Sequence, residues 1–158
     1  MKFLNLLIVC VVFSISGHAK DMDNEEEMYY AKKYFLIASS TKEYKKAKKI
    51  AEYLSLKSGI TLDLRGLHSD SSNSLTFSQK MCEKEWEEYP CYLARGRYDD
   101  GVYISIEDSN AYDFKDGYYI VIVASGKKEE VQKVLNKIKP FIKDAYIKTS
   151  KVYMGCMH

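Results

Sequence analysis

The sequence predicts an α+β fold in which two helices pack on one antiparallel sheet. The first observation is a pair of apolar helix stripes with identical spacing: Ala47, Ile50, Ala51 and Leu54, and then, 84 positions later, Val131, Val134, Leu135 and Ile138. The second is that a strand-like run precedes each stripe, at 34–38 and 118–124, and another follows it, at 60–64 and 145–152. Two βαβ units are therefore expected. Each unit exposes an apolar sheet face and an apolar helix stripe, so the two bury these surfaces most readily by sharing one sheet.

In the first unit, the strand at 34–38 ends in Ser39, Ser40 and Thr41, any of which can cap the following helix. The helix is expected over about 42–56, and Ser58 and Gly59 form a normal C-terminal stop. Apolar and polar residues then alternate over 60–64, which predicts a half-buried strand.

An insert separates the two units, at about 66–116. Loop-forming residues and a stretch without a clean period occupy 66–100, and loops of that length are usually functional or mobile. Val102, Ile104 and Ile106 then alternate with polar residues, which predicts an extra strand.

The second unit opens with the strand at 118–124. Its helix is expected to begin at about Lys128, because Glu129 and Glu130 suit the positive end of a helix dipole. Pro140 predicts a stop or a kink near the end of that helix, before the strand at 145–152.

The first nineteen residues are typical of a cleaved secretory signal. Lys2 precedes an apolar stretch too short to span a bilayer comfortably, and Gly17-His18-Ala19 provides a small-x-small exit. A retained anchor is the alternative. Residues 20–33 are expected to form a flexible leader, and 34–158 a single domain without stable membrane insertion after cleavage.

Charge and cysteine usage agree with export. Lys2 is the only charged residue of the signal segment, so the exported chain is close to neutral, and no nucleic-acid partner is expected. Cys82, Cys91 and Cys156 remain after cleavage, and two of them should pair in an oxidising compartment. Cys82 with Cys91 is favoured because they close a short loop. Pairing of either one with Cys156 would close a longer loop and is the alternative.

The two strand openings, Tyr34-Phe35-Leu36-Ile37-Ala38-Ser39 and Tyr119-Ile120-Val121-Ile122-Val123-Ala124-Ser125, resemble a family pattern. That pattern, aromatic-apolar-polar-apolar-Gly-Ser, belongs to the SPOR domain, an envelope module with a ferredoxin-like βαββαβ arrangement. The resemblance covers about 34–65 and 118–153. It implies a ligand, because SPOR domains bind peptidoglycan glycan strands that lack stem peptides.

This chain departs from the family on the open face of the sheet. Leu36 and Ile122 stand where the family usually has a polar residue. If Phe35, Ile37, Val121 and Val123 meet the helices, then Leu36, Ile120 and Ile122 face the other way. Such continuous apolar runs are typical of strands buried on both faces. The insert at 66–100 is the expected cover, and it would occlude or rebuild the family's glycan surface.

Fourteen tyrosines are the strongest compositional sign of recognition, since a tyrosine offers a sugar or a protein an apolar face and a polar tip. The candidate ligand-binding residues are Tyr34, Tyr103, Tyr118, Arg95 and Arg97. The alternative is that the tyrosines are shared between the edge of the core and the surface.

No catalytic residue, metal or cofactor is predicted. Cys156 and His158 form a C-x-H tail, but a zinc site needs about four ligands and no other pair has suitable spacing. The expected function is non-catalytic binding in the periplasm or outside the cell, with peptidoglycan glycan or an envelope protein as partner. A secreted protein-binding or inhibitor module acting through the tyrosine-rich insert is the alternative.

Overall fold

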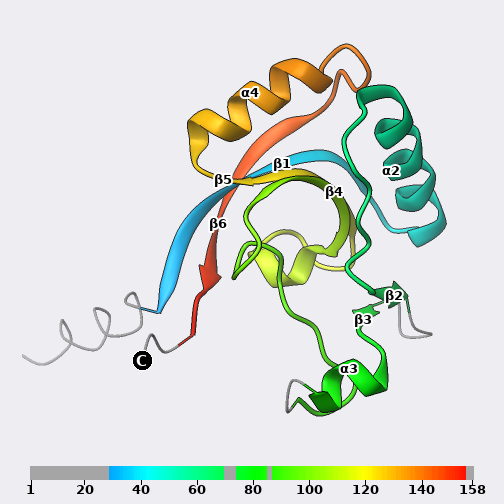
Figure 1. Cartoon of the computed structure of the whole chain (residues 1–158), viewed down its shortest axis with the longest axis vertical. Coiled ribbons are helices and arrows are strands. Elements are labelled where there is room, and N and C mark those ends of the chain that lie inside the picture. Colours follow the sequence, from blue (N-terminus) through cyan, green and yellow to red (C-terminus); the bar gives the residue numbers. More distant parts are fainter. Residues whose placement is uncertain (1–28, 70–73, 85–86, 156–158) are drawn as a thin grey trace, which may run out of the picture.

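The computed structural model describes residues 29–69, 74–84 and 87–155 (Figure 1). The predicted signal segment and Cys156 lie outside these residues. The elements in chain order are β1 (Tyr30–Thr41), α2 (Tyr44–Ser58), β2 (His68–Ser69), β3 (Leu75–Thr76), α3 (Gln79–Lys84), β4 (Gly101–Asp108), the 3₁₀ turn η1 (Ser109–Tyr112), β5 (Tyr119–Gly126), α4 (Lys128–Ile138) and β6 (Tyr146–Tyr153). None of the helices in the described ranges is long and apolar enough to cross a membrane.

The molecule is built on a four-stranded sheet in the order β4-β5-β1-β6. Every neighbouring pair in it is antiparallel. Helices α2 and α4 lie on the same side of the sheet (Figure 1). The α+β class and the two helices on an antiparallel sheet are therefore as the sequence predicts.

The two helix stripes form the centre of the core, as predicted. Ala47, Ala51 and Leu54 of α2 are fully buried, and α4 buries Val131 and Ile138. Helix α2 ends at Gly59, whose φ of 69° is left-handed and whose N–H donates to the carbonyl of Ser55 at 3.0 Å. Because the apolar residues recur every three or four positions, each helix buries one face and leaves its lysines in solvent.

The structure corrects the prediction of a strand at 60–64. This segment joins β4 through a single parallel bridge, Leu62 to Ile104, in which the Ile104 N–H donates to the Thr61 carbonyl at 2.8 Å. The next residues turn the chain away, since Arg65 and Gly66 have φ values of 57° and 71°. The strand beside β5 is instead β4, the one predicted as an extra strand.

The leader predicted over 20–33 is also too long. Strand β1 begins at Tyr30, four residues before the predicted start, because β6 extends far enough to pair with it: Tyr30 lies opposite Tyr153 and Lys33 opposite Ser150. Residues 30–33 therefore belong to the sheet, and the domain begins earlier than 34.

The facing of β1 differs from our expectation by one residue. Leu36 and Ala38 pack with the helices, while Phe35 and Ile37 lie on the opposite face. The expectation for β5 is confirmed, since Val121 packs with the helices and Ile122 faces away from them. Both faces of β1 are buried here, so the alternation of its side chains does not show which face meets the helices.

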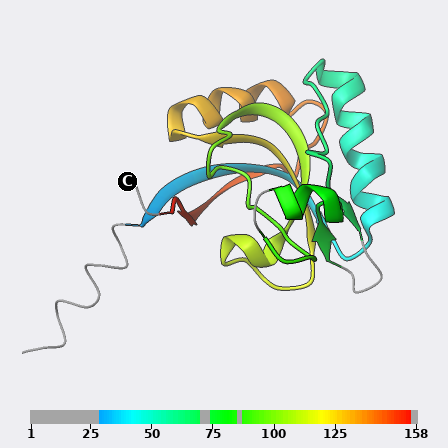
Figure 2. The ribbon, with the colours of Figure 1, turned by 60° about the horizontal axis from the view of Figure 1, so that its bottom comes forward.

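The sheet face opposite the helices is covered. Phe35, Ile37 and Ile122 are fully buried there under Tyr112 of η1, and Ala94, Ala111, Phe114 and Met154 pack against the same cluster. The cover therefore comes from the end of the predicted insert, near 94–97, and from the connection at 109–118. Figure 2 shows η1 beneath the sheet on the side away from α4.

The rest of the insert forms a small lobe that contains β2, β3 and α3 (Figure 1). Its disulfide joins Cys82 to Cys91, with Cα atoms 5.7 Å apart, as the favoured pairing predicted. Leu75, Phe77 and Cys82 of this lobe belong to the apolar cluster on the helix side, so the lobe extends the core under the edge of the sheet.

Candidate functional site

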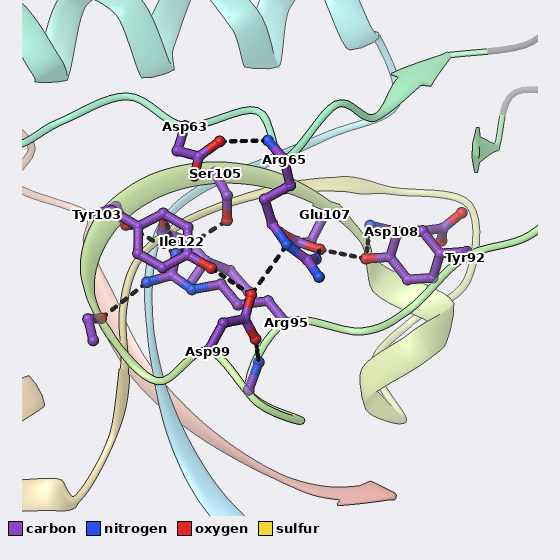
Figure 3. Close-up of polar contacts among 12 residues, drawn as sticks. Asp63, Arg65, Tyr92, Arg95, Asp99, Tyr103, Ser105, Glu107, Asp108 and Ile122 are labelled. Carbon is purple, nitrogen blue, oxygen red and sulfur yellow. Dashed lines mark hydrogen bonds and ion pairs between the residues drawn. The ribbon is translucent and has the colours of Figure 1, made fainter. Parts of the chain in front are cut away.

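Charged and polar side chains gather on the covered face beside β4, in what we call the polar cluster (Figure 3). Its members are Arg65, Tyr92, Arg95, Asp99, Tyr103, Ser105, Glu107 and Tyr112. They come from the turn after the first helix, the end of the insert, β4 and η1. Ser105 and Glu107 lie two residues apart on one strand, so both point to the same face.

Glu107 is the centre of the polar cluster and is fully buried. Its Oε2 accepts hydrogen bonds from Arg65 Nη1 at 2.8 Å, from the Tyr92 hydroxyl and from the Tyr112 hydroxyl at 3.3 Å. Arg65 is the charge partner, with its side chain only 12% exposed. A guanidinium and two phenols thus replace water at Oε2, whereas the buried Oε1 has no hydrogen-bond partner within the described residues.

Arg95 is also fully buried, and its guanidinium lies where the pairing of β4 with β5 is irregular. Nη1 donates to the carbonyls of Tyr103 at 2.8 Å and Ile122 at 3.1 Å, and Nη2 donates to the carbonyl of Gly101 at 2.9 Å. The guanidinium carbon also lies 3.6 Å from the centre of the Tyr103 ring. Arg95 thus supplies donors at a place where the strand ladder is interrupted.

Asp99 contacts Arg65 directly and is linked to Arg95 through Tyr103. It accepts hydrogen bonds from the Gly96 N–H at 2.8 Å and the Tyr103 hydroxyl at 2.7 Å, and it lies 3.2 Å from Arg65 Nε. Two cations, Arg65 and Arg95, are therefore matched by two anions, Asp99 and Glu107, so the cluster carries no net charge.

The pKa values of the two buried tyrosines are raised, and those of Asp99 and Arg95 are lowered. Burial, followed by the negative charge of Glu107, raises the pKa of Tyr92 and of Tyr112 well above 10.0. Burial acts to raise the pKa of Asp99, but the hydrogen bonds from Tyr103 and Gly96 and the nearby arginines outweigh it and lower that pKa. Burial lowers the pKa of Arg95. At neutral pH the phenols stay protonated and can donate to the carboxylates.

The polar cluster therefore holds the covering segments on the sheet. The structure corrects the prediction that Arg95 contacts a ligand, because this side chain is inside the protein with its donors directed at backbone carbonyls. Tyr103, another predicted residue, stacks on Arg95 and uses its hydroxyl on Asp99. The sequence predicted that both residues contact a ligand, whereas in the structure they contact each other.

A concave surface lies at the end of β1 and β6, and we call it the tyrosine hollow. It has a volume of about 340 Å³, and its walls include Tyr30, Tyr92, Arg97, Asp113, Lys151 and Tyr153. The rings of Tyr30 and Tyr153 have centres 5.4 Å apart, and the Arg97 guanidinium carbon lies 5.2 Å from the centre of the Tyr153 ring. The buried Nε of Arg97 has no hydrogen-bond partner within the described residues.

A second, smaller depression, which we call the lysine hollow, contains the predicted residue Tyr118. Its volume is about 210 Å³, and its walls include Phe114, Lys115, Tyr118, Tyr146 and Lys148. The Lys148 ammonium lies 4.0 Å from the centre of the Phe114 ring, and Lys115 and Lys42 lie over Tyr118 at 5.7 and 5.6 Å. The remaining predicted residue, Tyr34, lies elsewhere, beside the start of α4.

The five predicted residues are thus divided among four places, and only Arg97 belongs to the tyrosine hollow. Sequence reasoning missed Tyr30 because it assigned residues 20–33 to the leader. It missed Tyr153 because that residue follows the predicted end of the last strand. Tyr30 lies before the first strand-like run and Tyr153 after the last one. Because these two runs pair antiparallel, the two tyrosines meet at one end of the sheet.

No group of three or more potential metal-binding side chains occurs within the described ranges. Comparison of the chain with protein-family models, with curated proteins and with solved structures finds no match.

Proposed function

We propose that this protein is a non-catalytic binding protein of the cell envelope, and that it binds peptidoglycan glycan in the tyrosine hollow. The observation that carries the proposal is the pairing of exposed tyrosine rings with Arg97 in one concave surface. Glycan strands without stem peptides present both apolar sugar faces and free carboxylates. Such a ligand uses the rings and the cation together.

The topology supports the expected resemblance to SPOR domains. The main elements follow the order β1-α2-β4-β5-α4-β6, and the strands lie in the order β4-β5-β1-β6. This order supports a ferredoxin-like βαββαβ arrangement, with the insert between α2 and β4. In such a protein the covered sheet face moves ligand binding to the margin of the sheet, where the tyrosine hollow lies.

The chemistry of the tyrosine hollow suits an acidic sugar polymer. Tyr30 and Tyr153 are 45% and 44% exposed, so their faces are available for stacking against sugar C–H groups. Arg97 lines the hollow beside the Tyr153 ring, and its planar guanidinium matches the geometry of a carboxylate. The Cys82–Cys91 disulfide agrees with export, since disulfides persist in oxidising compartments.

Sedimentation with purified sacculi tests the proposal, after an amidase has removed the stem peptides. We expect the wild-type chain without residues 1–19 to sediment, and Tyr30→Ala with Tyr153→Ala to weaken binding about tenfold by removing both stacking faces. Tyr53→Ala is the matched control, because Tyr53 is also 45% exposed but lies on α2. Equal sedimentation of the double variant and this control would place the binding surface elsewhere.

One observation favours the second candidate, docking to a protein. The insert exposes Tyr98 at 76% and Tyr89 at 44%, and exposed aromatic residues are enriched in protein interfaces. If the wild-type protein does not sediment with sacculi, Tyr98→Ala should instead weaken its capture by a purified envelope protein.

A further inference from the structure

We propose that the lysine hollow is a second binding site and that it takes a phosphoryl group. The site is separate from the tyrosine hollow: Tyr146 and Lys148, at the start of β6, line the lysine hollow, whereas Tyr153, at the end of β6, lines the tyrosine hollow. No described side chain belongs to both hollows. The proposal therefore goes beyond glycan binding and does not depend on it.

Three lysines from distant parts of the chain meet at the lysine hollow. Lys148 of β6 and Lys115 of the connection after β4 line it, and Lys42, which follows β1, lies beside it. The Lys42 and Lys115 ammoniums lie 5.6 and 5.7 Å from the centre of the Tyr118 ring, and the Lys148 ammonium lies 4.0 Å from the centre of the Phe114 ring. These ring contacts hold the flexible lysine stems close to the hollow.

The positive charge of the lysine hollow is not neutralised by the described part of the chain. None of the three lysines forms an ion pair with a described carboxylate, and no described acidic side chain lines the hollow. Two acids close by line other surfaces: Asp113 lines the tyrosine hollow, and Asp144 lines a groove that shares Ser40 and Tyr146 with the lysine hollow. Three cations gathered at one depression repel one another, and an anion bound among them offsets that repulsion.

The number of cations favours a phosphoryl group over a carboxylate. A phosphate monoester carries a charge of about −1.5 to −2 at neutral pH and presents three strong acceptor oxygens, whereas a carboxylate carries one charge on two oxygens. Three ammoniums match the first better than the second. Lysine also binds phosphate as a compact point charge, without the planar fork that arginine offers a carboxylate.

The connection that carries Lys115 is held in place by its own hydrogen bonds. The Ser109 hydroxyl donates to the Lys115 carbonyl at 2.8 Å and accepts from the Tyr118 N–H at 3.1 Å. The side-chain carbonyl of Asn110 accepts from the Gly117 N–H at 3.0 Å. The backbone on this side of the hollow is therefore already ordered, so little conformational entropy is lost when an anion binds.

Titration with glycerol phosphate at low ionic strength, followed by the amide NMR shifts of the full exported chain, tests the proposal. We expect saturable shifts at Phe114, Lys115 and Tyr118, none with glycerol, and binding of acetate at least about tenfold weaker. Lys148→Gln and Lys115→Gln should each weaken glycerol phosphate binding about tenfold, because each removes a charged donor. Lys45→Gln is the matched control, since Lys45 is exposed on α2. Equal affinity of all three variants, or shifts only at other residues, would overturn the proposal.

Vesicles separate the two sources of a phosphoryl group, a soluble ester and a lipid headgroup. The probe is phosphatidylcholine with phosphatidic acid, and phosphatidylcholine alone is its control. Capture that is lost in Lys148→Gln would assign the site to a lipid headgroup, and binding of glycerol phosphate without capture would assign it to a soluble ester. Binding of neither probe would refute the site.

The test is independent of the proposed function. Lys148→Gln should sediment with sacculi as the wild type does, and Tyr30→Ala with Tyr153→Ala should bind glycerol phosphate as the wild type does, because the two hollows have separate walls. Loss of both activities in either variant would contradict the separation of the two sites.

Discussion

The two faces of the sheet are covered in different ways. On one face, regular helices bury apolar stripes against Leu36, Ile104 and Val121. On the other, irregular segments cover Phe35, Ile37 and Ile122, and a network of buried charges lies beside them. An irregular segment has no repeating apolar face to bury, and its backbone polar groups lack a helical ladder. Specific side chains must therefore hold it in place.

The difference shows where each face is vulnerable. The helix face depends on apolar area and packing, which tolerate changes of similar volume. The opposite face depends on donors and acceptors that match one by one, and removal of one member leaves its partner buried without a hydrogen bond. Three experiments test this contrast.

The largest effect should follow from a charge placed at the centre of the covered face. Ile122→Asp puts an unpaired carboxylate among Phe35, Ile37 and Tyr112, so we expect a loss of about 4 kcal/mol or more in the free energy of unfolding. Urea denaturation measures it. Val102→Asp is the control, because Val102 is 52% exposed on β4. A similar midpoint for Ile122→Asp and the wild type would show that this face is open.

A smaller effect should follow from loss of the buried guanidinium. Arg95→Met keeps an unbranched apolar stem but leaves the carbonyls of Gly101, Tyr103 and Ile122 without these donors. We expect a loss of about 3 kcal/mol in unfolding free energy. Arg97→Met makes the same change two residues later, at a side chain whose described contacts are with rings, and should cost less than about 1 kcal/mol. If the two variants unfold alike, apolar packing alone holds the cover.

The smallest effect is a pH dependence of the covered face. The pKa of Tyr112 is raised in the folded protein, so its contribution to stability is complete below pH 10 and is lost as the pH rises further, when only the unfolded chain ionises. This slope is about 1.4 kcal/mol per pH unit for one such group. Tyr112→Phe should make the loss of stability between pH 10 and 11 shallower, as measured by urea midpoints. Tyr53→Phe on α2 should not change it, and an unchanged slope for Tyr112→Phe would contradict the assignment.

The candidate site was only partly predictable from the sequence. Arg97 and the importance of tyrosines were predicted, because aromatic and cationic residues in an irregular stretch favour recognition. Arg95 looked equivalent to Arg97 in the sequence, yet one is buried at a strand irregularity and the other lines a hollow. The polar cluster was not predicted, since Arg65 and Glu107 are 42 residues apart and nothing local marks them as partners.

The sequence by itself determined the two helices, the strands β1, β4, β5 and β6 to within a few residues, and the favoured disulfide. Each of these depends on local periodicity or on a short loop, which a single stretch of chain carries in full. Only the tertiary structure decided that β4 and not the segment at 60–64 joins the sheet, and that Leu36 and not Phe35 faces the helices. In the first choice both segments are apolar enough to be buried, and β4 joins the sheet because it makes the longer set of backbone hydrogen bonds with β5, whereas 60–64 makes a single bridge to β4. In the second, both faces of β1 are buried, so only the packing of the whole chain decides which face meets the helices.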